Sequence, residues 1–195
     1  MPLMEADPTS ILTDVRDRHA FREWLERYHA IEVECWVEVR RGRPTDEDVF
    51  WYLDAVEEAL CFGWIDGRAG TLDETHHIRR FTPRRKGSAY SQPNIERLIR
   101  MDAQGLIHPK VRDSVLPVIR APFVFPPDIL DALREDETVW ANYTQFSDSY
   151  KRIRVAYIEA ARKRPEEFSK RLNSFIEKTR RGKRIMGYGG IDRYY

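Results

Sequence analysis

The sequence predicts an α+β protein in which a small antiparallel or mixed sheet with helices is followed by an all-helical part. Three observations lead to this class. The segment "VECWVEV" (33–39) alternates apolar and polar residues as a strand does, and the pattern from residue 109 onward is helical throughout. Between the two parts, "RAPFVFPPD" (120–128) contains three prolines and is typical of a linker. We therefore expect an α+β domain at 1–120 and a helical region at 121–195.

The first helix is predicted in the second half of 13–29, where apolar residues recur at near-helical spacing. The strand at 33–39 follows it. Thr45 is a suitable N-cap, and the acidic residues 46–48 come next, where the positive end of a helix dipole favours negative charge. We therefore expect the second helix to begin after Thr45. Its buried face would carry Val49, Leu53, Val56 and Leu60.

Glycines and prolines define the next elements. The three glycines of "GWIDGRAG" (63–70) predict a chain reversal with a short extended piece at its start. A second extended segment is expected at 77–82, and Pro83 either ends its pairing or places it at a sheet edge, because proline has no backbone donor.

Helices account for the remainder of the chain. Ser91 is expected to cap one helix, which closes near Gly105. Later helices are expected to start at Pro127, Asp136, Ser147 or Ser149, and Pro165, and the last of them stops at Gly182.

The composition excludes several classes of protein. The 33 basic and 32 acidic side chains leave a net charge of +1, which argues against a protein that coats a polyanion, although a local patch can still bind one anion. Cys35 and Cys61 lie in apolar runs without CxxC spacing, so we expect buried thiols in a reducing compartment. No stretch approaches the roughly 18 apolar residues of a membrane span. We expect a soluble, cytoplasmic protein.

Three blocks resemble one known family. "AVEEALCFGWIDG" (55–67), "RRFTPRRKGSAYS" (79–91) and "YIEAARK" (157–163), in this order, are similar to the bacterial YdeI/OmpD-associated family, whose members are also called bacteriocin-protection proteins. The resemblance runs from about Phe21 to Lys183. It implies a link to the cell envelope and to tolerance of bacteriocins, with no reaction attached. Members commonly have Ser-x-Trp-Ser where this chain has "SAYS" (88–91).

The cations at 79–86 form the main candidate site. On a strand, Arg80 would lie on one face and Arg79 with Phe81 on the other, and loop arginines near a helix start favour phosphate or carboxylate. We expect Arg80 and Arg84 to converge on one anion near the start of the helix after Ser91, with Arg85 and Lys86 in solvent. The alternative is that Arg80 pairs with a structural carboxylate, such as Asp66 or Asp73, and that the other cations form a solvated edge.

Other motifs carry weaker signals. Asp66 of "WIDG" is either a pocket carboxylate near Arg79 or Arg80 or a turn residue before Gly67. "DETHH" (73–77) is similar to a metal cluster, but adjacent histidines on a strand point to opposite faces, so no metal is expected. The run "KTRRGKR" (178–184) fits the cationic last turn of a helix. No complete catalytic motif occurs, so the sequence leaves open whether the protein is an enzyme.

The leading hypothesis is a non-enzymatic binding protein for an anionic small molecule or a protein partner, without a cofactor. The candidate ligand-binding residues are Trp64, Asp66, Arg79, Arg80, Phe81, Arg84, Tyr90 and Ser91. An enzyme that uses Asp66 with Arg80 on a phosphorylated or carboxylated substrate is one alternative. Weak nucleic-acid binding through the two basic runs is the other, and the near-zero net charge disfavours it.

Overall fold

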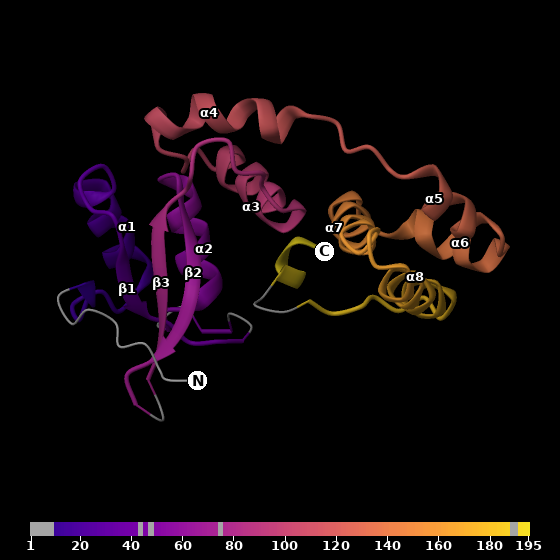
Figure 1. Cartoon of the computed structure of the whole chain (residues 1–195), viewed down its shortest axis with the longest axis horizontal. Coiled ribbons are helices and arrows are strands. Elements are labelled where there is room, and N and C mark those ends of the chain that lie inside the picture. The colour runs from indigo at the N-terminus through magenta and orange to yellow at the C-terminus, as the bar shows by residue number, and fades with distance from the viewer. Residues whose placement is uncertain (1–9, 43–44, 47–48, 74–75, 188–190) are drawn as a thin grey trace. The chain divides into compact units, whose positions relative to one another are not determined.

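The computed structural model of the chain describes residues 10–42, 45–46, 49–73, 76–187 and 191–195 (Figure 1). The chain divides into two compact units, Met1–Ile119 and Arg120–Tyr195. The described strands all lie in the first unit, and the second is built from helices. The α+β class predicted from the sequence is therefore confirmed.

In the described part of the first unit, the sheet has three strands in the order β1-β3-β2. The strands are β1 (Cys35–Glu38), β2 (Trp64–Thr71) and β3 (His77–Pro83), and both pairings are antiparallel. The central strand is β3, so Pro83 ends the strand and does not place it at an edge. Just beyond it, the Arg84 backbone N–H donates to the carbonyl of Gly63 at 2.9 Å.

Two predictions about the sheet were wrong. The segment 63–70 is no chain reversal, because most of it belongs to the eight-residue strand β2, which shifts register between Asp66 and Ala69. A Cβ on Gly70 would lie 3.2 Å from atoms of both Trp36 and Ile78. This glycine makes room for the Trp36 ring, which is buried, so β1 is not half-buried as its alternation predicts.

Four α-helices among the described residues complete the first unit, and α2 packs against β2 (Figure 1). They are α1 (Arg18–Tyr28), α2 (Tyr52–Cys61), α3 (Gln92–Ala103) and α4 (Pro109–Arg120). The predicted start and end of α3 are confirmed, with Ser91 at the N-cap and Gly105 at φ +68°. The core between these helices and the sheet contains Phe21, Leu25, Val37, Val56, Leu60 and Phe81.

The second helix starts later than predicted. Thr45 does not cap it, because the chain before α2 is extended: the Arg40 N–H donates to the Phe50 carbonyl, and the Tyr52 N–H donates to the Arg40 carbonyl, both at 2.9 Å. The Phe50 and Trp51 side chains are buried in this conformation, and Trp51 becomes the N-cap. The acidic residues 47 and 48 lie outside the described residues.

The second unit follows the predicted helix starts. Its elements are α5 (Pro127–Arg134), α6 (Glu137–Gln145), α7 (Asp148–Glu159), α8 (Pro165–Arg180) and the short 3-10 helix η2 (Ile191–Tyr194). Asp136 caps α6 by accepting from Val139 N–H at 3.0 Å, and Ser147 caps α7 by accepting from Tyr150 N–H at 3.3 Å. The unit has an apolar core of its own, which contains Ile129, Leu133, Val139, Tyr150, Val155, Ile158 and Phe175.

Both cysteines are free and buried, as predicted. Burial raises the pKa of the Cys61 thiol to about 12 and raises that of Cys35 further still. These thiols are therefore protonated side chains of the core. No helix among the described residues has the length and apolar character that crossing a bilayer demands.

Candidate anion-binding site

The eight predicted site residues do not form one cluster, and two of them belong to the core. Trp64 is 1% exposed, and its indole N–H donates to the carbonyl of His29 at 3.0 Å. Phe81 is fully buried, with its ring centroid 5.4 Å from that of Phe21. Neither side chain is accessible to a ligand, because both pack the sheet against α1.

The predicted convergence of Arg80 and Arg84 on one anion does not occur. Arg80 donates from Nε to Glu34 Oε2 at 3.0 Å, and its Nη2 contacts the same oxygen. Asp66 lies opposite Phe81 in the sheet, whereas Arg80 is the residue before Phe81 and therefore points to the other face. The Asp66–Arg80 pair that the enzyme alternative required is thus absent, and the partner of Arg80 is neither Asp66 nor Asp73.

Asp66 instead meets Arg79 and a residue that the sequence did not indicate, Tyr52. The Tyr52 hydroxyl donates to Asp66 Oδ2 at 2.6 Å, and Arg79 Nη1 lies 4.0 Å from the same oxygen. The Arg79 guanidinium also stands 4.5 Å from the Tyr52 ring centroid and donates to the Gly67 carbonyl at 3.0 Å. Burial, and next the charge of Asp66, raise the pKa of Tyr52 to about 12, so the phenol stays protonated.

Residues 84–91, the basic loop, close on themselves through Arg84. Its Nη2 donates to the carbonyls of Ser88 at 3.1 Å and Ala89 at 3.0 Å, and its guanidinium carbon lies 3.7 Å from the Tyr90 ring centroid. The turn at Gly87 has φ +78°, and the Ser88 hydroxyl donates to the Arg85 carbonyl at 2.7 Å. One nitrogen of the guanidinium and one ring face thus hold Arg84 in a fixed orientation.

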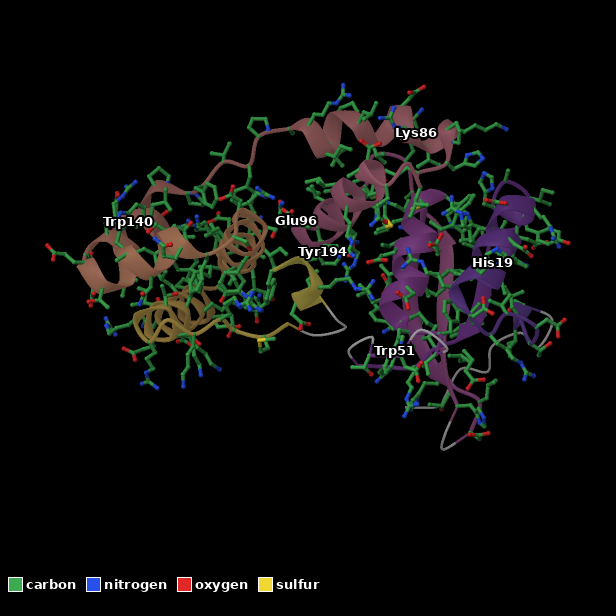
Figure 2. The ribbon with its side chains drawn as sticks, turned by 180° about the vertical axis from the view of Figure 1, so that it is seen from behind. His19, Trp51, Lys86, Glu96, Trp140 and Tyr194 are labelled. Atoms are coloured by element: carbon green, nitrogen blue, oxygen red, sulfur yellow. The ribbon has the colours of Figure 1, made fainter. Side chains whose placement is uncertain are left out.

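The rest of the loop's charge faces solvent. Arg85 and Lys86 are exposed, as predicted (Lys86 is labelled in Figure 2), and within the described chain their side chains have no hydrogen-bond or ion-pair partner. The same holds for Nε and Nη1 of Arg84. Three consecutive cations therefore stand without a neutralising carboxylate in that part of the chain, and one of them is preorganised. Such an arrangement can bind an anion.

Ser91 has the position predicted for it but not the bond. It is the N-cap of α3, yet its side chain makes no capping hydrogen bond, and only its carbonyl accepts, from the N–H groups of Asn94 at 2.9 Å and Ile95 at 3.0 Å. Sequence reasoning thus located the start of the helix correctly. A ligand contact of the Ser91 hydroxyl stays a prediction.

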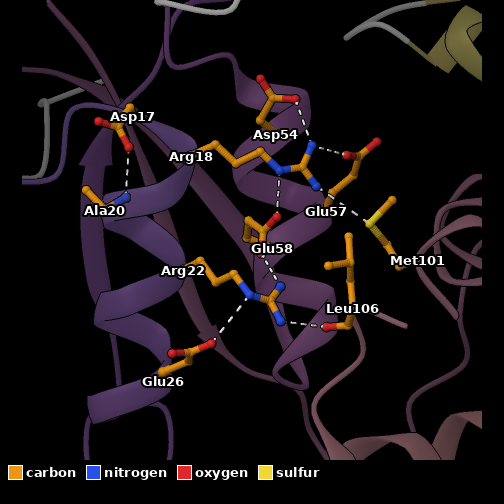
Figure 3. A network of polar contacts seen from close by, with 10 residues as sticks. All are labelled: Asp17, Arg18, Ala20, Arg22, Glu26, Asp54, Glu57, Glu58, Met101 and Leu106. Carbon is orange, nitrogen blue, oxygen red and sulfur yellow. Dashed lines mark hydrogen bonds and ion pairs between the residues drawn. The ribbon is translucent and has the colours of Figure 1, made fainter. Parts of the chain in front are cut away.

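Sequence reasoning missed an ion-pair network between α1 and α2 (Figure 3). Arg18 donates to Glu58 at 2.6 Å, Glu57 at 2.7 Å and Asp54 at 3.3 Å, and Arg22 donates to Glu58 at 2.8 Å. The signal was present, because Arg18 and Arg22 are four residues apart on one helix face and the acids recur at three and four residues on the next helix.

In this network, two arginines face three carboxylates, so each cation has acidic partners within the fold. Glu57 is fully buried and Glu58 is 2% exposed. Burial alone would lower the pKa of the Arg18 guanidinium, but the charges of Glu58 and Glu57 raise it overall. Arg18 and Arg22 are therefore committed to the fold, unlike the cations of the basic loop.

Cations of the two remaining charged runs also have carboxylate partners in the fold. Arg180 donates to Asp136 at 3.0 Å and contacts Glu177, to which Arg181 also donates, at 3.3 Å. In the 73–77 run, the ring of His76 contacts Asp73 at 2.6 Å. Within the part of the chain that the structure describes, no three His, Cys, Asp or Glu side chains lie close enough together to hold a metal ion.

Two family models match the chain. Residues 13–114 match the one described as "Domain of unknown function (DUF8412)", and residues 122–182 match "Bacteriocin-protection, YdeI or OmpD-Associated". The second match confirms the resemblance inferred from the sequence, but it contains only the block at 157–163. The blocks at 55–67 and 79–91 lie inside the first match. No curated protein and no solved structure matches the chain.

Proposed function

The chain belongs to the DUF8412 family, its residues 122–182 match the bacteriocin-protection, YdeI or OmpD-associated family, and from this premise we propose that its first unit binds an anionic partner through the basic loop. The protein would act in bacteriocin protection as a binding protein. Its ligand is a small molecule or partner with several negative charges, because the loop offers three adjacent positive ones.

The observation that carries this proposal is the fixed guanidinium of Arg84. Stacking on Tyr90 and three hydrogen bonds from Nη2 restrain the side chain, while Nε and Nη1 have no partner among the described residues. An arginine that is already ordered loses little conformational entropy on binding, and its planar edge fits phosphate or carboxylate oxygens. Arg85 and Lys86 add charge at the same loop.

The contacts of the loop support binding more than catalysis. Within the described chain, Arg84 is accompanied by carbonyls, a hydroxyl and an aromatic ring. General acid or base catalysis needs a group that exchanges protons near neutral pH, and these groups do not. The carboxylate of Asp66 accepts from the Tyr52 phenol on the helix side of the sheet and is committed to that bond.

The test is a calorimetric titration with pyrophosphate, and with inorganic phosphate as a weaker probe. We expect Arg85→Ala/Lys86→Ala to weaken pyrophosphate binding at least tenfold, or roughly 1.4 kcal/mol. Arg84→Lys should do the same although it keeps the charge, because lysine has no planar edge. Lys163→Ala/Lys170→Ala, which removes two exposed cations from the second unit, is the matched control.

Three results would contradict the proposal. Wild-type protein that binds neither probe would end it, and equal weakening by the control variant would show that only net charge matters. Tighter, steeply salt-dependent binding of a single-stranded oligonucleotide would assign the loop to nucleic acid instead.

A further inference from the structure

In the second unit, one face of α7 is covered by the last described segment of the chain, residues 191–195. The Tyr195 side chain packs against the apolar core of the unit, and Tyr194, the residue before it, is labelled in Figure 2. The Ser149 hydroxyl donates to the carbonyl of Tyr194. The Tyr195 ring meets the Tyr150 ring edge to face, with centroids 4.7 Å apart.

Arg154, one turn along from Tyr150, holds the phenol of Tyr195. Its Nη2 donates both to the Tyr195 hydroxyl and to the Ile185 carbonyl, and the guanidinium carbon lies 5.2 Å from the Tyr195 ring centroid. In the same region, the Ile185 N–H donates to the Tyr150 hydroxyl at 2.8 Å. Arg154 is only 9% exposed, and its Nε is buried without a hydrogen-bond partner in the described chain.

These contacts are those of a binding site with its ligand. α7 supplies a hydroxyl for a main-chain carbonyl, a ring for a ring, and a guanidinium for a phenol oxygen. A buried arginine is costly unless its N–H groups are satisfied, so the site depends on an occupant that brings acceptors. The two consecutive tyrosines bring one acceptor each: the main-chain carbonyl of Tyr194 for the Ser149 hydroxyl, and the phenol oxygen of Tyr195 for Arg154.

The site and its occupant belong to different parts of the chain. Ser149, Tyr150 and Arg154 lie inside the residues matched by the bacteriocin-protection family model, which end at 182, and the occupant lies beyond them. The recognition surface is thus part of the matched helical region, and the tyrosine segment is attached after it.

We propose that this face of α7 is a binding site for a segment with two consecutive tyrosines, and that the resident segment exchanges with the same segment of a second copy of the chain. The contacts are identical in both arrangements, so the balance depends on concentration. An attached segment acts at an effective concentration on the order of millimolar, so each chain keeps its own segment in dilute solution. Exchange becomes visible when the resident segment can no longer compete.

Two full-length variants with complementary defects test this proposal. Tyr194→Ala/Tyr195→Ala keeps the site but lacks a competent segment, and Arg154→Ala keeps the segment but lacks the site. We expect each variant alone to sediment as a monomer and the equimolar mixture to contain a heterodimer. A mixture of folded variants that stays monomeric contradicts the exchange.

A second measurement separates recognition from dimer formation and covers the case in which the double variant does not fold. A labelled synthetic peptide with the sequence of residues 183–195 is titrated against wild type and against Tyr195→Ala, which retains Tyr194. We expect at least tenfold tighter binding to the variant, because the wild-type site is occupied. Equal affinity for both proteins, or equal affinity of a control peptide with alanine at both tyrosines, overturns the proposal.

Discussion

The α1–α2 network and the basic loop are both rich in cations, and the fold treats them in opposite ways. Arg18 and Arg22 face Asp54, Glu57 and Glu58 on a neighbouring helix. The cations at 84–86 face carbonyls, a ring and solvent. Local charge density is therefore a poor guide to an anion site. What decides is whether another element brings carboxylates to the same place.

The comparison predicts its largest effect for Arg18→Ala. Removing one partner of a buried ion pair costs about 3–5 kcal/mol, and because the Arg18 side chain is 34% exposed we expect a smaller cost, of about 2 kcal/mol. Urea unfolding measures it. Arg27→Ala is the control, since its pair with Glu23 is exposed and contributes less than about 0.5 kcal/mol. Equal costs for the two variants would place Arg18 among ordinary surface charges.

A smaller loss of stability is expected when Asp66 is replaced. Its side chain is less buried than the glutamates of the α1–α2 network and more buried than the cations at 85–86. Asp66→Ala leaves the Tyr52 hydroxyl without its acceptor, which costs about 1 kcal/mol. The pKa of Tyr52 should fall at the same time, because the charge of Asp66 is the second cause that raises it. Ultraviolet titration of the tyrosines detects that change, and Tyr52→Phe identifies the signal. An unchanged titration curve would contradict the hydrogen bond.

Two histidines, one partly buried and one exposed, should make opposite contributions to the pH dependence of stability. The pKa of His108 is lowered by burial and then by His29 and Lys110, so the unfolded chain binds this proton more tightly than the folded one. Its contribution to stability therefore rises as pH increases through about 6.5. The pKa of exposed His76 is raised by its hydrogen bond to Asp73, so its contribution is present at low pH and lost as pH rises through the folded pKa.

The measurement is Tm as a function of pH between about 5.5 and 7.5, on either side of the histidine pKa. His108→Gln should flatten the rise of Tm with pH relative to wild type. His76→Gln should steepen it, because it removes a contribution of opposite sign. Identical profiles for wild type and both variants would show that neither ring differs between folded and unfolded states.

The smallest effect is predicted for the basic loop itself. Arg85→Ala/Lys86→Ala removes two exposed cations whose side chains have no partner within the described chain, so the free energy of unfolding should stay within about 0.5 kcal/mol of wild type. Urea unfolding is again the measurement. A loss above about 1 kcal/mol would make the loop a structural element and would weaken its assignment to a ligand.

Local signals predicted most of the helices correctly. Asp136 and Ser147 cap the helices that were expected to begin there, and Pro127 and Pro165 stand in the first turns of α5 and α8. Each of these signals acts within a few residues. The start of α2 could not be predicted in this way, because it depends on the bridge between Arg40 and Trp51.

The candidate site shows the same contrast between features set by neighbouring residues, which could be predicted, and features that depend on distant residues, which could not. Alternation along β3 was enough to place Arg79 and Arg80 on opposite faces, and the contact of Asp66 with Arg79 forms. The partner of Arg80 was missed because Glu34 reaches it only through the pairing of β1 with β3, across more than 40 residues. The stacking of Arg84 on Tyr90 is local but depends on the turn at Gly87, which charge and periodicity do not reveal.

The strand order β1-β3-β2 also determines when the first unit can close during synthesis. β2 and β3 are neighbours in sequence and pair as soon as both have left the ribosome. β1 emerges first but must wait for His77–Pro83, so its buried Cys35 and Val37 lack their sheet neighbours while α2 and β2 are being made. An arrest of translation between β1 and β3 would leave an unpaired strand edge on the nascent chain, where chaperone binding or aggregation begins.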